Sequence, residues 1–259
     1  MQKYEDPAHW NDAAQQYEKT AHPFTALYAE TALARVPLGP DSRVLDVAAG
    51  TGALALAAAR TGAQVLATDF SPGMVAAIAA KALPNVDTAV MDGQELALPD
   101  STFDAVFSIF GVMMFPDWRK GLAEMARVTR PGGTGVVATW EDTGAATFLL
   151  CRQVCRTLFP DREPMPMPAG LQVLNDPDDF TREMIAAGYT DVTIEKITHD
   201  FTLEVAALDA PEKLFGMSPD WAALNDSEQA AVVAEIRRMA DGRETLPVPS
   251  TALVAVARR

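Results

Sequence analysis

The sequence predicts an α/β fold, in which a mainly parallel sheet is covered by helices on both faces. From Arg43 to Ala59 a short apolar run, a glycine turn and an Ala/Leu helix pattern follow one another directly. The first run is apolar at Val44, Leu45 and Val47, which is typical of a parallel strand buried on both sides. Further apolar runs alternate with helical patterns along the chain, so we expect a doubly wound sheet.

The expected strands are short runs of apolar and β-branched residues bounded by turn residues. They are 43–47, 64–70, 85–93, 103–110, 135–140, 191–203 and 251–257. The expected helices have apolar residues at helical spacing or a run of good helix formers. They lie within 1–35 and at 53–59, 73–82, 117–130, 145–158, 176–187, 207–215 and 227–240.

Local signals set several of these boundaries. Ser71 and Pro72 have the residue types of an N-cap and a first helical position, so they mark the start of the helix at 73–82. The run Pro131-Gly132-Gly133 is a helix stop, and we expect it to end the helix at 117–130. The pairs Asp6-Pro7 and His22-Pro23 interrupt the amphipathic leader of residues 1–35.

Composition and charge limit the function. The chain has 259 residues, 49% of them apolar, which is enough for one substantial core or one domain with a modest cap. The net charge of −14 disfavours nucleic-acid partners. No apolar run approaches the roughly 20 residues that a membrane helix needs, and the polar start does not resemble a signal peptide. We therefore expect a cytoplasmic protein, in which Cys151 and Cys155 are buried thiols.

The turn after the first strand has the composition of a binding site. Gly50 and Gly52 allow the backbone to approach a ligand, because they have no Cβ atom. The helix that follows directs its free N–H groups toward the same point, which favours a polar or anionic group. With Ala55 the glycines also satisfy the G-x-G-x-x-G/A pattern of dinucleotide-binding proteins. A nicotinamide-dependent oxidoreductase therefore stays open as an alternative.

Three acids accompany the first three strands. Asp46 lies within the first strand, Asp69 lies near the end of the second, and Asp92 lies near the end of the third. The carboxyl ends of parallel strands meet at one edge of a sheet, where such folds bind ligands. Asp69 follows Asp46 by 23 residues, close to the step of about 20 residues from a glycine loop to a ribose-binding acid. A carboxylate there can accept hydrogen bonds from both ribose hydroxyls.

Three segments carry a family resemblance. Residues 46–52, D-x-A-x-G-T-G, resemble the first motif of class I S-adenosylmethionine-dependent methyltransferases, although Ala48 stands where those enzymes usually have glycine. Residues 98–106, LPDSTFDAV, resemble a segment of the methyltransferases related to the quinone-biosynthesis C-methyltransferases. Residues 127–133, RVTRPGG, are similar to that family's R-V-L-K-P-G-G. The resemblance is strong over about 35–140 and only general elsewhere.

The resemblance implies S-adenosyl-L-methionine as cofactor and a Rossmann-like, seven-stranded, mainly parallel sheet whose last strand is antiparallel beside the fifth. It implies that Asp69 binds the ribose, that Asp92 and Gln94 bind the adenine edge, and that Ser108 and Phe110 line the methyl-transfer face. Asp46, Gly50 and Gly52 would hold the methionine end. The cofactor-binding residues implied in this way are Tyr17, Asp46, Ala48, Gly50, Thr51, Gly52, Asp69, Phe70, Met74, Asp92, Gly93, Gln94, Ser108 and Phe110.

The resemblance also suggests a division of the chain. Residues 1–35 form a helical leader that folds over the cofactor, and 36–142 form the cofactor-binding core. Residues 143–259 complete the sheet at about 176–203 and 251–259 and add a small helical cap from insertions at about 143–175 and 206–248. The insertions are rich in methionine and aromatic residues, which suit an apolar small molecule.

The expected activity is methyl transfer to oxygen, nitrogen or carbon of a small, apolar-bodied metabolite. Methyl transfer from a sulfonium is an in-line displacement, so the protein mainly aligns the reactants and excludes water. A base is needed only where the acceptor loses a proton. The candidate bases are His22, His199, Tyr17, Tyr28 and Glu141. None is assigned, no metal is expected, and the oligomeric state stays open. A non-catalytic S-adenosylmethionine-binding protein is the remaining alternative.

Overall fold

The computed structural model describes residues 5–141, 147–163, 165–216 and 218–259. The chain divides into two compact units. Residues 1–4 of the predicted leader, 142 of the predicted core and 143–146 of the first predicted insertion lie outside the described residues. Unit 1 consists of residues 1–140, 168–197 and 252–259. Unit 2 consists of residues 141–167 and 198–251. None of the described helices is long and apolar enough to cross a membrane.

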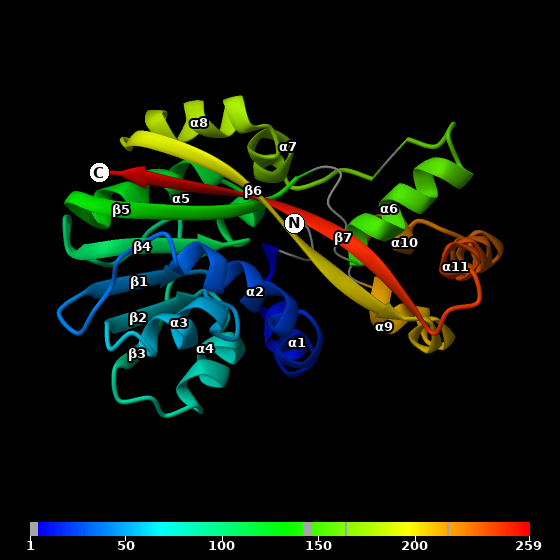
Figure 1. The fold of residues 1–259 in the computed structure, drawn as a ribbon, viewed down its shortest axis with the longest axis horizontal. Helices are drawn as coiled ribbons and strands as arrows, with labels where there is room; N and C mark the ends of the chain where they lie inside the picture. Colours follow the sequence, from blue (N-terminus) through cyan, green and yellow to red (C-terminus); the bar gives the residue numbers. More distant parts are fainter. Residues whose placement is uncertain (1–4, 142–146, 164, 217) are drawn as a thin grey trace. The chain divides into compact units, whose positions relative to one another are not determined.

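A seven-stranded sheet organises the fold, with the order β3-β2-β1-β4-β5-β7-β6 (Figure 1). The strands are β1 (Arg43–Val47), β2 (Gln64–Asp69), β3 (Val86–Val90), β4 (Phe103–Ile109), β5 (Thr129–Trp140), β6 (Thr190–Glu204) and β7 (Thr245–Arg258). Neighbours from β3 to β5 pair in parallel, and β7 pairs antiparallel with β5. The predicted doubly wound sheet with an antiparallel last strand is confirmed.

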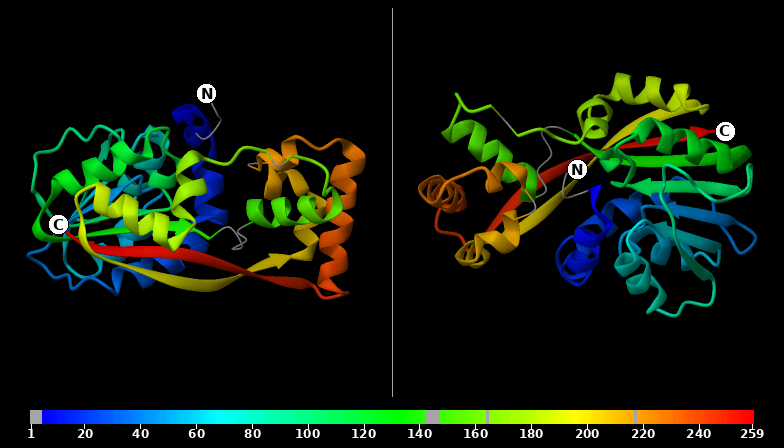
Figure 2. Two further views of the ribbon diagram at one scale, coloured as in Figure 1. Left: turned by 90° about the horizontal axis from the view of Figure 1, so that it is seen from above. Right: turned by 180° about the vertical axis from the view of Figure 1, so that it is seen from behind.

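Helices cover both faces of the sheet in unit 1, with α3 on one face and α5 on the other (Figures 1 and 2). The described helices of this unit are α1 (Pro7–Thr20), α2 (His22–Leu33), α3 (Ala53–Ala59), α4 (Pro72–Ala79), the 3₁₀ helix η2 (Val112–Met114), α5 (Trp118–Val128), α7 (Ala169–Leu174) and α8 (Pro177–Ala186). From β1 the chain proceeds outward to β2 and β3, and it later proceeds in the opposite direction through β4 and β5. Because right-handed crossovers in opposite directions place their helices on opposite faces, the two halves of the sheet are covered on different sides.

The strand order reverses between β1 and β4, because the chain extends the sheet in opposite directions from these two strands. Ligands bind at such a reversal in sheets of this kind.

Several local predictions are confirmed in detail. The Ser71 side chain caps α4 by accepting a hydrogen bond from the Met74 N–H at 3.2 Å, and Pro72 is the first helical residue. Asp117 caps α5 in the same way through the Lys120 N–H at 3.0 Å. Val44, Leu45 and Val47 of β1 are fully buried, as their apolar pattern indicates.

The boundary between α5 and β5 differs from the prediction. We expected a helix to residue 130 and a stop at 131–133, but α5 ends at Val128 and β5 begins at Thr129. Thr129 pairs with Phe103 of β4, and its hydroxyl donates to the Met125 carbonyl. The Pro-Gly-Gly run therefore lies within the strand, beside a register shift between β4 and β5.

Two further boundaries also differ. The helix expected at 207–215 is divided into the 3₁₀ helix η3 (Val205–Asp209) and α9 (Pro211–Phe215). Pro211 has no N–H and disfavours a helical conformation at the preceding residue, and Ala210 is indeed non-helical. The last strand starts at Thr245 rather than at 251.

Unit 2 is helical apart from parts of β6 and β7. Besides η3 and α9 it contains α6 (Thr147–Leu158), α10 (Pro219–Ala222) and α11 (Asp226–Ala240). The helix α6 packs against α9, α10 and α11, and a capping box of Asn225 and Glu228 begins α11. Both cysteines of α6 are buried free thiols. The first insertion, expected to reach residue 175, ends at Met167 in this division, since α7 belongs to unit 1.

Candidate functional site

The turn after β1 lies at the strand-order reversal, and its backbone is left-handed at three positions. The φ angles are +56° at Ala48, +55° at Gly50 and +91° at Gly52. Glycine adopts these angles without strain, whereas an L-residue with a side chain is destabilised by roughly 1–2 kcal/mol. Ala48 therefore carries strain at the position where related enzymes usually have glycine. A Cβ atom at Gly52 would lie 3.0 Å from Ile78, which also favours glycine there.

Asp46 is a buried acid inside β1, with 1% of its surface exposed. Its Oδ2 accepts a hydrogen bond from the Ala55 N–H at 3.0 Å, which ties the first turn of α3 to the strand. Burial raises the pKa of Asp46 to about 7, and repulsion from Asp69 acts in the same direction. The site therefore contains a carboxylate that a nearby cation would stabilise.

Asp69 connects the turns that follow β1 and β2. Its Oδ2 accepts from the Gly50 N–H at 2.9 Å and its Oδ1 accepts from the Ser71 N–H at 2.9 Å. Burial raises the pKa of Asp69 to about 6, although these backbone hydrogen bonds lower it. A carboxylate offers about four acceptor positions, so Asp69 keeps capacity for a ligand hydroxyl at the edge of the sheet.

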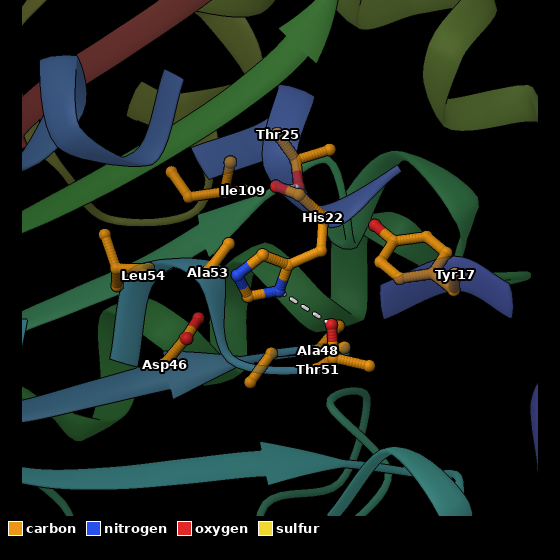
Figure 3. Close-up of a pocket in the computed structure, with 11 residues that line it drawn as sticks. Tyr17, His22, Thr25, Asp46, Ala48, Thr51, Ala53, Leu54 and Ile109 are labelled. Carbon is orange, nitrogen blue, oxygen red and sulfur yellow. Dashed lines mark hydrogen bonds between the residues drawn. The ribbon is translucent and has the colours of Figure 1, made fainter. Parts of the chain in front are cut away.

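A small pocket lies beside this turn and is lined by both the leader and the sheet (Figure 3). Its walls include Tyr17, His22 and Thr25 of the leader, together with Leu54 and Ile109. The His22 imidazole projects into the pocket, and its Nδ1 lies 2.7 Å from the Thr51 hydroxyl oxygen (Figure 3).

Two titratable leader side chains in this pocket are uncharged at neutral pH. Burial lowers the pKa of His22, so its imidazole is neutral and one ring nitrogen can accept a proton. Burial raises the pKa of Tyr17 to about 12, so its phenol stays protonated. The leader thus supplies neutral hydrogen-bonding groups beside the buried Asp46.

The leader is fixed to the sheet edge by Asn11 of α1. The Asn11 Oδ1 accepts hydrogen bonds from the Ser71 hydroxyl and from the Gly73 N–H, both at 2.7 Å. A Cβ atom at Gly73 would lie 2.9 Å from the Asn11 Cα, so glycine allows this close approach. No local pattern indicates a role for Asn11, because its hydrogen bonds join residues 60 and 62 positions apart in the sequence.

The third acid has a different environment from the first two. Asp92 is exposed after β3, and its carboxylate accepts from the Gln94 N–H and from the Gln94 side-chain amide. The Gln94 Oε1 accepts from the Asp117 N–H at 2.7 Å, which connects this loop to the start of α5. Gly93 is buried where a Cβ atom would meet the Phe115 ring. The loop is thus held by its own hydrogen bonds at the same edge of the sheet.

Two predicted site residues, Ser108 and Phe110, lie at the carboxyl end of β4 and have different surroundings. The buried Ser108 Oγ accepts from the Val112 N–H at 3.1 Å and holds the turn into η2. Phe110 has a left-handed backbone, with φ of +61°. Its ring stacks on Trp140, at the end of β5, with ring centroids 3.8 Å apart and planes 7° apart.

Phe24 and Tyr28 of α2 complete an aromatic cluster with Phe110 and Trp140. Phe24 lies parallel to Trp140 at 6.0 Å, and Tyr28 meets the edges of Phe110 and Trp140 at 5.3 and 5.1 Å. Trp140 is not among the site residues predicted from the sequence. The rule that placed Phe110 at the carboxyl edge applies equally to the last residue of the fifth strand and could have found it.

Two further predicted residues, Phe70 and Met74, are not among the residues that line the pocket. Phe70 is partly buried after β2, while Met74 is 2% exposed within α4 and belongs to the core. Of the other candidate bases, Glu141 and His199 belong to unit 2. Among the described residues, no group of three His, Cys, Asp or Glu side chains is placed to hold a metal ion.

Comparison with known proteins identifies the class. Residues 44–133 match a family model described as a methyltransferase domain. The chain is 35% identical over 174 residues to a demethylmenaquinone methyltransferase of Corynebacterium efficiens, covering 63% of this chain and 74% of that protein. Further relatives match over about two fifths of this chain and under half of their own lengths.

Solved structures share the fold at low identity. The YcgJ protein of Bacillus subtilis superposes with a TM-score of 0.58 and 18% identity, covering 92% of this chain and 99% of that one. A phosphoethanolamine N-methyltransferase of Haemonchus contortus, solved with S-adenosylhomocysteine, gives a TM-score of 0.54 and 17% identity, covering 90% of this chain and 52% of that one. The protein belongs to the class I S-adenosylmethionine-dependent methyltransferases. It is an enzyme that uses S-adenosylmethionine to methylate a small molecule.

Proposed function

We propose that the methyl acceptor is an aromatic ring of the quinone type, in its reduced form. The observation that carries this proposal is the relationship to a protein named demethylmenaquinone methyltransferase, of which the chain covers about three quarters. The cluster of Phe24, Tyr28, Phe110 and Trp140 is itself buried, with 0–9% of each residue exposed, so it packs α2 against the ends of β4 and β5 beside the proposed acceptor site. Phe110 directly follows β4, which borders the strand-order reversal, and Trp140 is the last residue of the neighbouring strand β5.

The cofactor, when bound, supplies a methyl group that is already activated on a sulfonium. In the proposal Asp69 accepts hydrogen bonds from the ribose hydroxyls, since it closes β2 and keeps acceptor capacity. Gly50 and Gly52, with their left-handed backbone, allow the methionine end to approach the turn. Asp46 contributes negative charge next to that turn. Ala48, Thr51 and Tyr17 form walls of the pocket beside it.

The adenine would lie toward the third strand. Asp92 would accept from the adenine amino group, with Gln94 and the Gly93 backbone beside it. This placement rests on the exposed Asp92 carboxylate at the edge of the sheet. Phe70 would flank the base, whereas Met74 lies in the core beneath it, and Ser108 would support the turn that carries Phe110.

Methylation of a ring carbon requires that the acceptor lose a proton. His22 is the described pocket residue whose neutral imidazole can accept one at neutral pH. Replacing it in His22→Gln keeps a hydrogen-bonding side chain and removes the base. A loss of kcat with unchanged affinity for S-adenosylhomocysteine would support that role.

The first test is calorimetric titration with S-adenosylhomocysteine, with NADH as the control. We expect micromolar binding of the first ligand alone. Binding of NADH alone would favour a nicotinamide oxidoreductase. The second test measures transfer of a labelled methyl group to reduced naphthoquinones, phenols and amines. Transfer to none of them, by protein that binds S-adenosylhomocysteine, would contradict the proposed acceptor and favour a non-catalytic role.

The aromatic cluster is tested separately by Trp140→Leu. Because Trp140 packs at the end of β5, we expect kcat/KM for a reduced naphthoquinone to fall about two- to tenfold, while the affinity for S-adenosylhomocysteine stays within about twofold. This corresponds to the roughly 0.5–1.5 kcal/mol that an aromatic pair contributes beyond its buried area. The matched control is Trp118→Leu, because Trp118 is also buried in unit 1 but lies on α5. Equal losses in both variants would contradict a specific role for the cluster.

A further inference from the structure

Unit 2 contains a cavity that is lined by one of the two cysteines of the chain. The cavity has a volume of about 240 Å³, and Phe159, Met165 and Leu224 form apolar parts of its walls. Cys155 lies in the same walls, with 7% of the residue exposed. Cys151, one turn earlier on α6, is fully buried and is not among the residues that line the cavity. The two thiols therefore differ in whether a small molecule can approach them.

The charged side chains around this cavity balance one another. Arg152 forms an ion pair with Asp220, whose Oδ2 lies 3.0 Å from the Arg152 Nη1. Arg162 forms a second ion pair with Glu228 at 2.8 Å. The two other charged residues of the walls, one basic and one acidic, are Arg156 and Glu163. Since no net charge is left to attract an ion, the cavity favours a neutral molecule.

Cys155 is also the more readily activated of the two thiols. The cysteines are four residues apart on α6, so their side chains lie on the same face of the helix. The Cys151 thiol donates a hydrogen bond to the Cys155 sulfur, which lowers the pKa of the Cys155 thiol and raises the pKa of the Cys151 thiol. The Arg162 guanidinium also lowers the pKa of Cys155. Burial and the carboxylates of Asp220 and Glu228 act in the opposite direction. Because the thiolate is the nucleophile, the thiol that lines the cavity is the one that can react.

An internal disulfide is not the expected product of this pair. Residues four apart on a helix have Cβ atoms about 5–6 Å apart, whereas a disulfide needs a Cβ–Cβ distance of about 3.5–4.5 Å. Closing that difference would distort α6, which packs against α9, α10 and α11. An external electrophile is therefore the expected reaction partner of Cys155.

We propose that Cys155, with Cys151 as its hydrogen-bond donor, is a modification site for neutral, apolar α,β-unsaturated carbonyl compounds that enter this cavity. An apolar cavity of about 150 Å³ holds a benzene ring, so a volume of about 240 Å³ accommodates a small ring with a short side chain. The Cys155 sulfur forms a bond to the β-carbon, the π electrons move to the α-carbon, and the α-carbon takes up a proton as the thiol loses one. This addition needs no oxidant and releases no ion into a cavity whose charges are already balanced.

The site uses none of the residues assigned to the cofactor or the acceptor, so its failure would leave the proposed function untouched. Timed reactions of the whole protein with N-butylmaleimide and with 4-maleimidobutyrate, followed by mass spectrometry of the intact chain and its peptides, test the proposal. The two reagents share the reactive group and differ in one carboxylate. Each rate is divided by the rate of the same reagent with free 2-mercaptoethanol.

We expect one adduct in the folded protein, on Cys155, and a rate at least tenfold higher for N-butylmaleimide than for 4-maleimidobutyrate. In urea both cysteines should react, which shows that the reagents can detect them. Absence of an adduct in the folded protein, equal labelling of Cys151, or equal rates for the two reagents would overturn the proposal.

A substitution in the cavity wall locates the reaction. Ala223→Phe adds bulk to the wall and should slow labelling by N-butylmaleimide at least threefold. Ala230→Phe is the matched control, because Ala230 is exposed on α11 and is not among the residues that line the cavity. Equal rates in these two variants would place the reaction outside the cavity and refute the proposal.

Substitutions of Cys151 test its role as hydrogen-bond donor. Cys151→Ala removes the donor, so labelling of Cys155 should slow at least threefold at pH 7 and its pH profile should shift to alkaline values. The rates of Cys151→Ala and the unchanged protein should converge at a pH where the thiol is fully ionised. Cys151→Ser keeps a donor and should retain the rate within about twofold. An unchanged pH profile in Cys151→Ala would refute the proposed role of Cys151.

Discussion

Replacing the buried acid of β1 in Asp46→Asn should stabilise the free protein at alkaline pH. Burial raises the pKa of Asp46 to about 7 from the ordinary value of 3.8. The folded protein therefore holds a proton that the unfolded chain has lost, and the free energy of unfolding falls as the pH rises between those values. About 3 pH units at about 1.4 kcal/mol each give about 4 kcal/mol.

Asparagine cannot ionise, and its side-chain oxygen can still accept from the Ala55 N–H. The variant should therefore lose the contribution of Asp46 to the pH dependence while keeping the tie between β1 and α3. We expect the variant to be more stable than the unchanged protein by about 2–4 kcal/mol at pH 8 and by less than about 1 kcal/mol at pH 4. The contribution of Asp69, whose pKa is raised to about 6, remains in both proteins.

Thermal unfolding from pH 4 to pH 8, without cofactor, measures this difference. The Tm of the variant should exceed that of the unchanged protein by about 5 °C or more at pH 8, and the two should converge toward pH 4. Asp92→Asn is the matched control, because it makes the same change at an exposed carboxylate. Equal pH dependence of Tm in Asp46→Asn and the unchanged protein would refute the assignment of a destabilising buried charge. The same variant should bind S-adenosylmethionine more weakly, because the site loses negative charge beside a cationic ligand.

The other predictions concern the edge of the sheet. Asp69→Ala removes a charge-assisted hydrogen-bond acceptor and should weaken S-adenosylhomocysteine binding by about 1.5–3 kcal/mol, measured by calorimetry; unchanged affinity would remove Asp69 from the site. Ala48→Gly relieves a left-handed backbone with φ of +56° and should raise the free energy of unfolding by about 1 kcal/mol in urea titrations, whereas a decrease would show that the strain is absent. Asn11→Ala removes two hydrogen bonds to the β2–α4 turn and should speed cofactor dissociation in stopped-flow measurements; an unchanged rate would mean that α1 does not limit release.

The elements at the sheet edge were predictable because local and global signals agree there. The apolar run of β1 and the Gly50-x-Gly52 turn predict a strand, a left-handed turn and a helix without reference to the rest of the chain. Ser71 and Pro72 likewise set the start of α4. The end of α5 was predicted less well, because the pairing of Thr129 with Phe103 depends on a neighbouring strand. A local helix stop at residues 131–133 could not show that the chain already pairs two residues earlier.

The sequence predicts which site residues lie close together only where the order of the strands brings their ends to the same edge of the sheet. Asp46 and Asp69 converge because parallel strands place their carboxyl ends at one edge, a rule that needs no coordinates. The attachment of Asn11 to Ser71, by contrast, joins a leader helix to a distant turn. No spacing in the sequence indicates it. The role of Ser108 as a lining residue stays a prediction, and the structure adds that its hydroxyl oxygen accepts from the Val112 N–H in the following turn.

This difference explains why the sequence indicates the cofactor more firmly than the acceptor. The residues proposed to bind the cofactor lie at the ends of neighbouring strands, so their proximity follows from the sheet order, and Asp69 contacts the turn after β1 directly. The aromatic cluster instead brings α2 against the ends of β4 and β5, and its geometry depends on how Tyr28 packs beside Phe110 and Trp140. A substitution at Phe24 or Tyr28 can therefore change how α2 packs against the ends of β4 and β5 without removing the hydrogen bonds of Asp69. It follows that acceptor preference in this enzyme should respond to substitutions in α2 more strongly than cofactor affinity does.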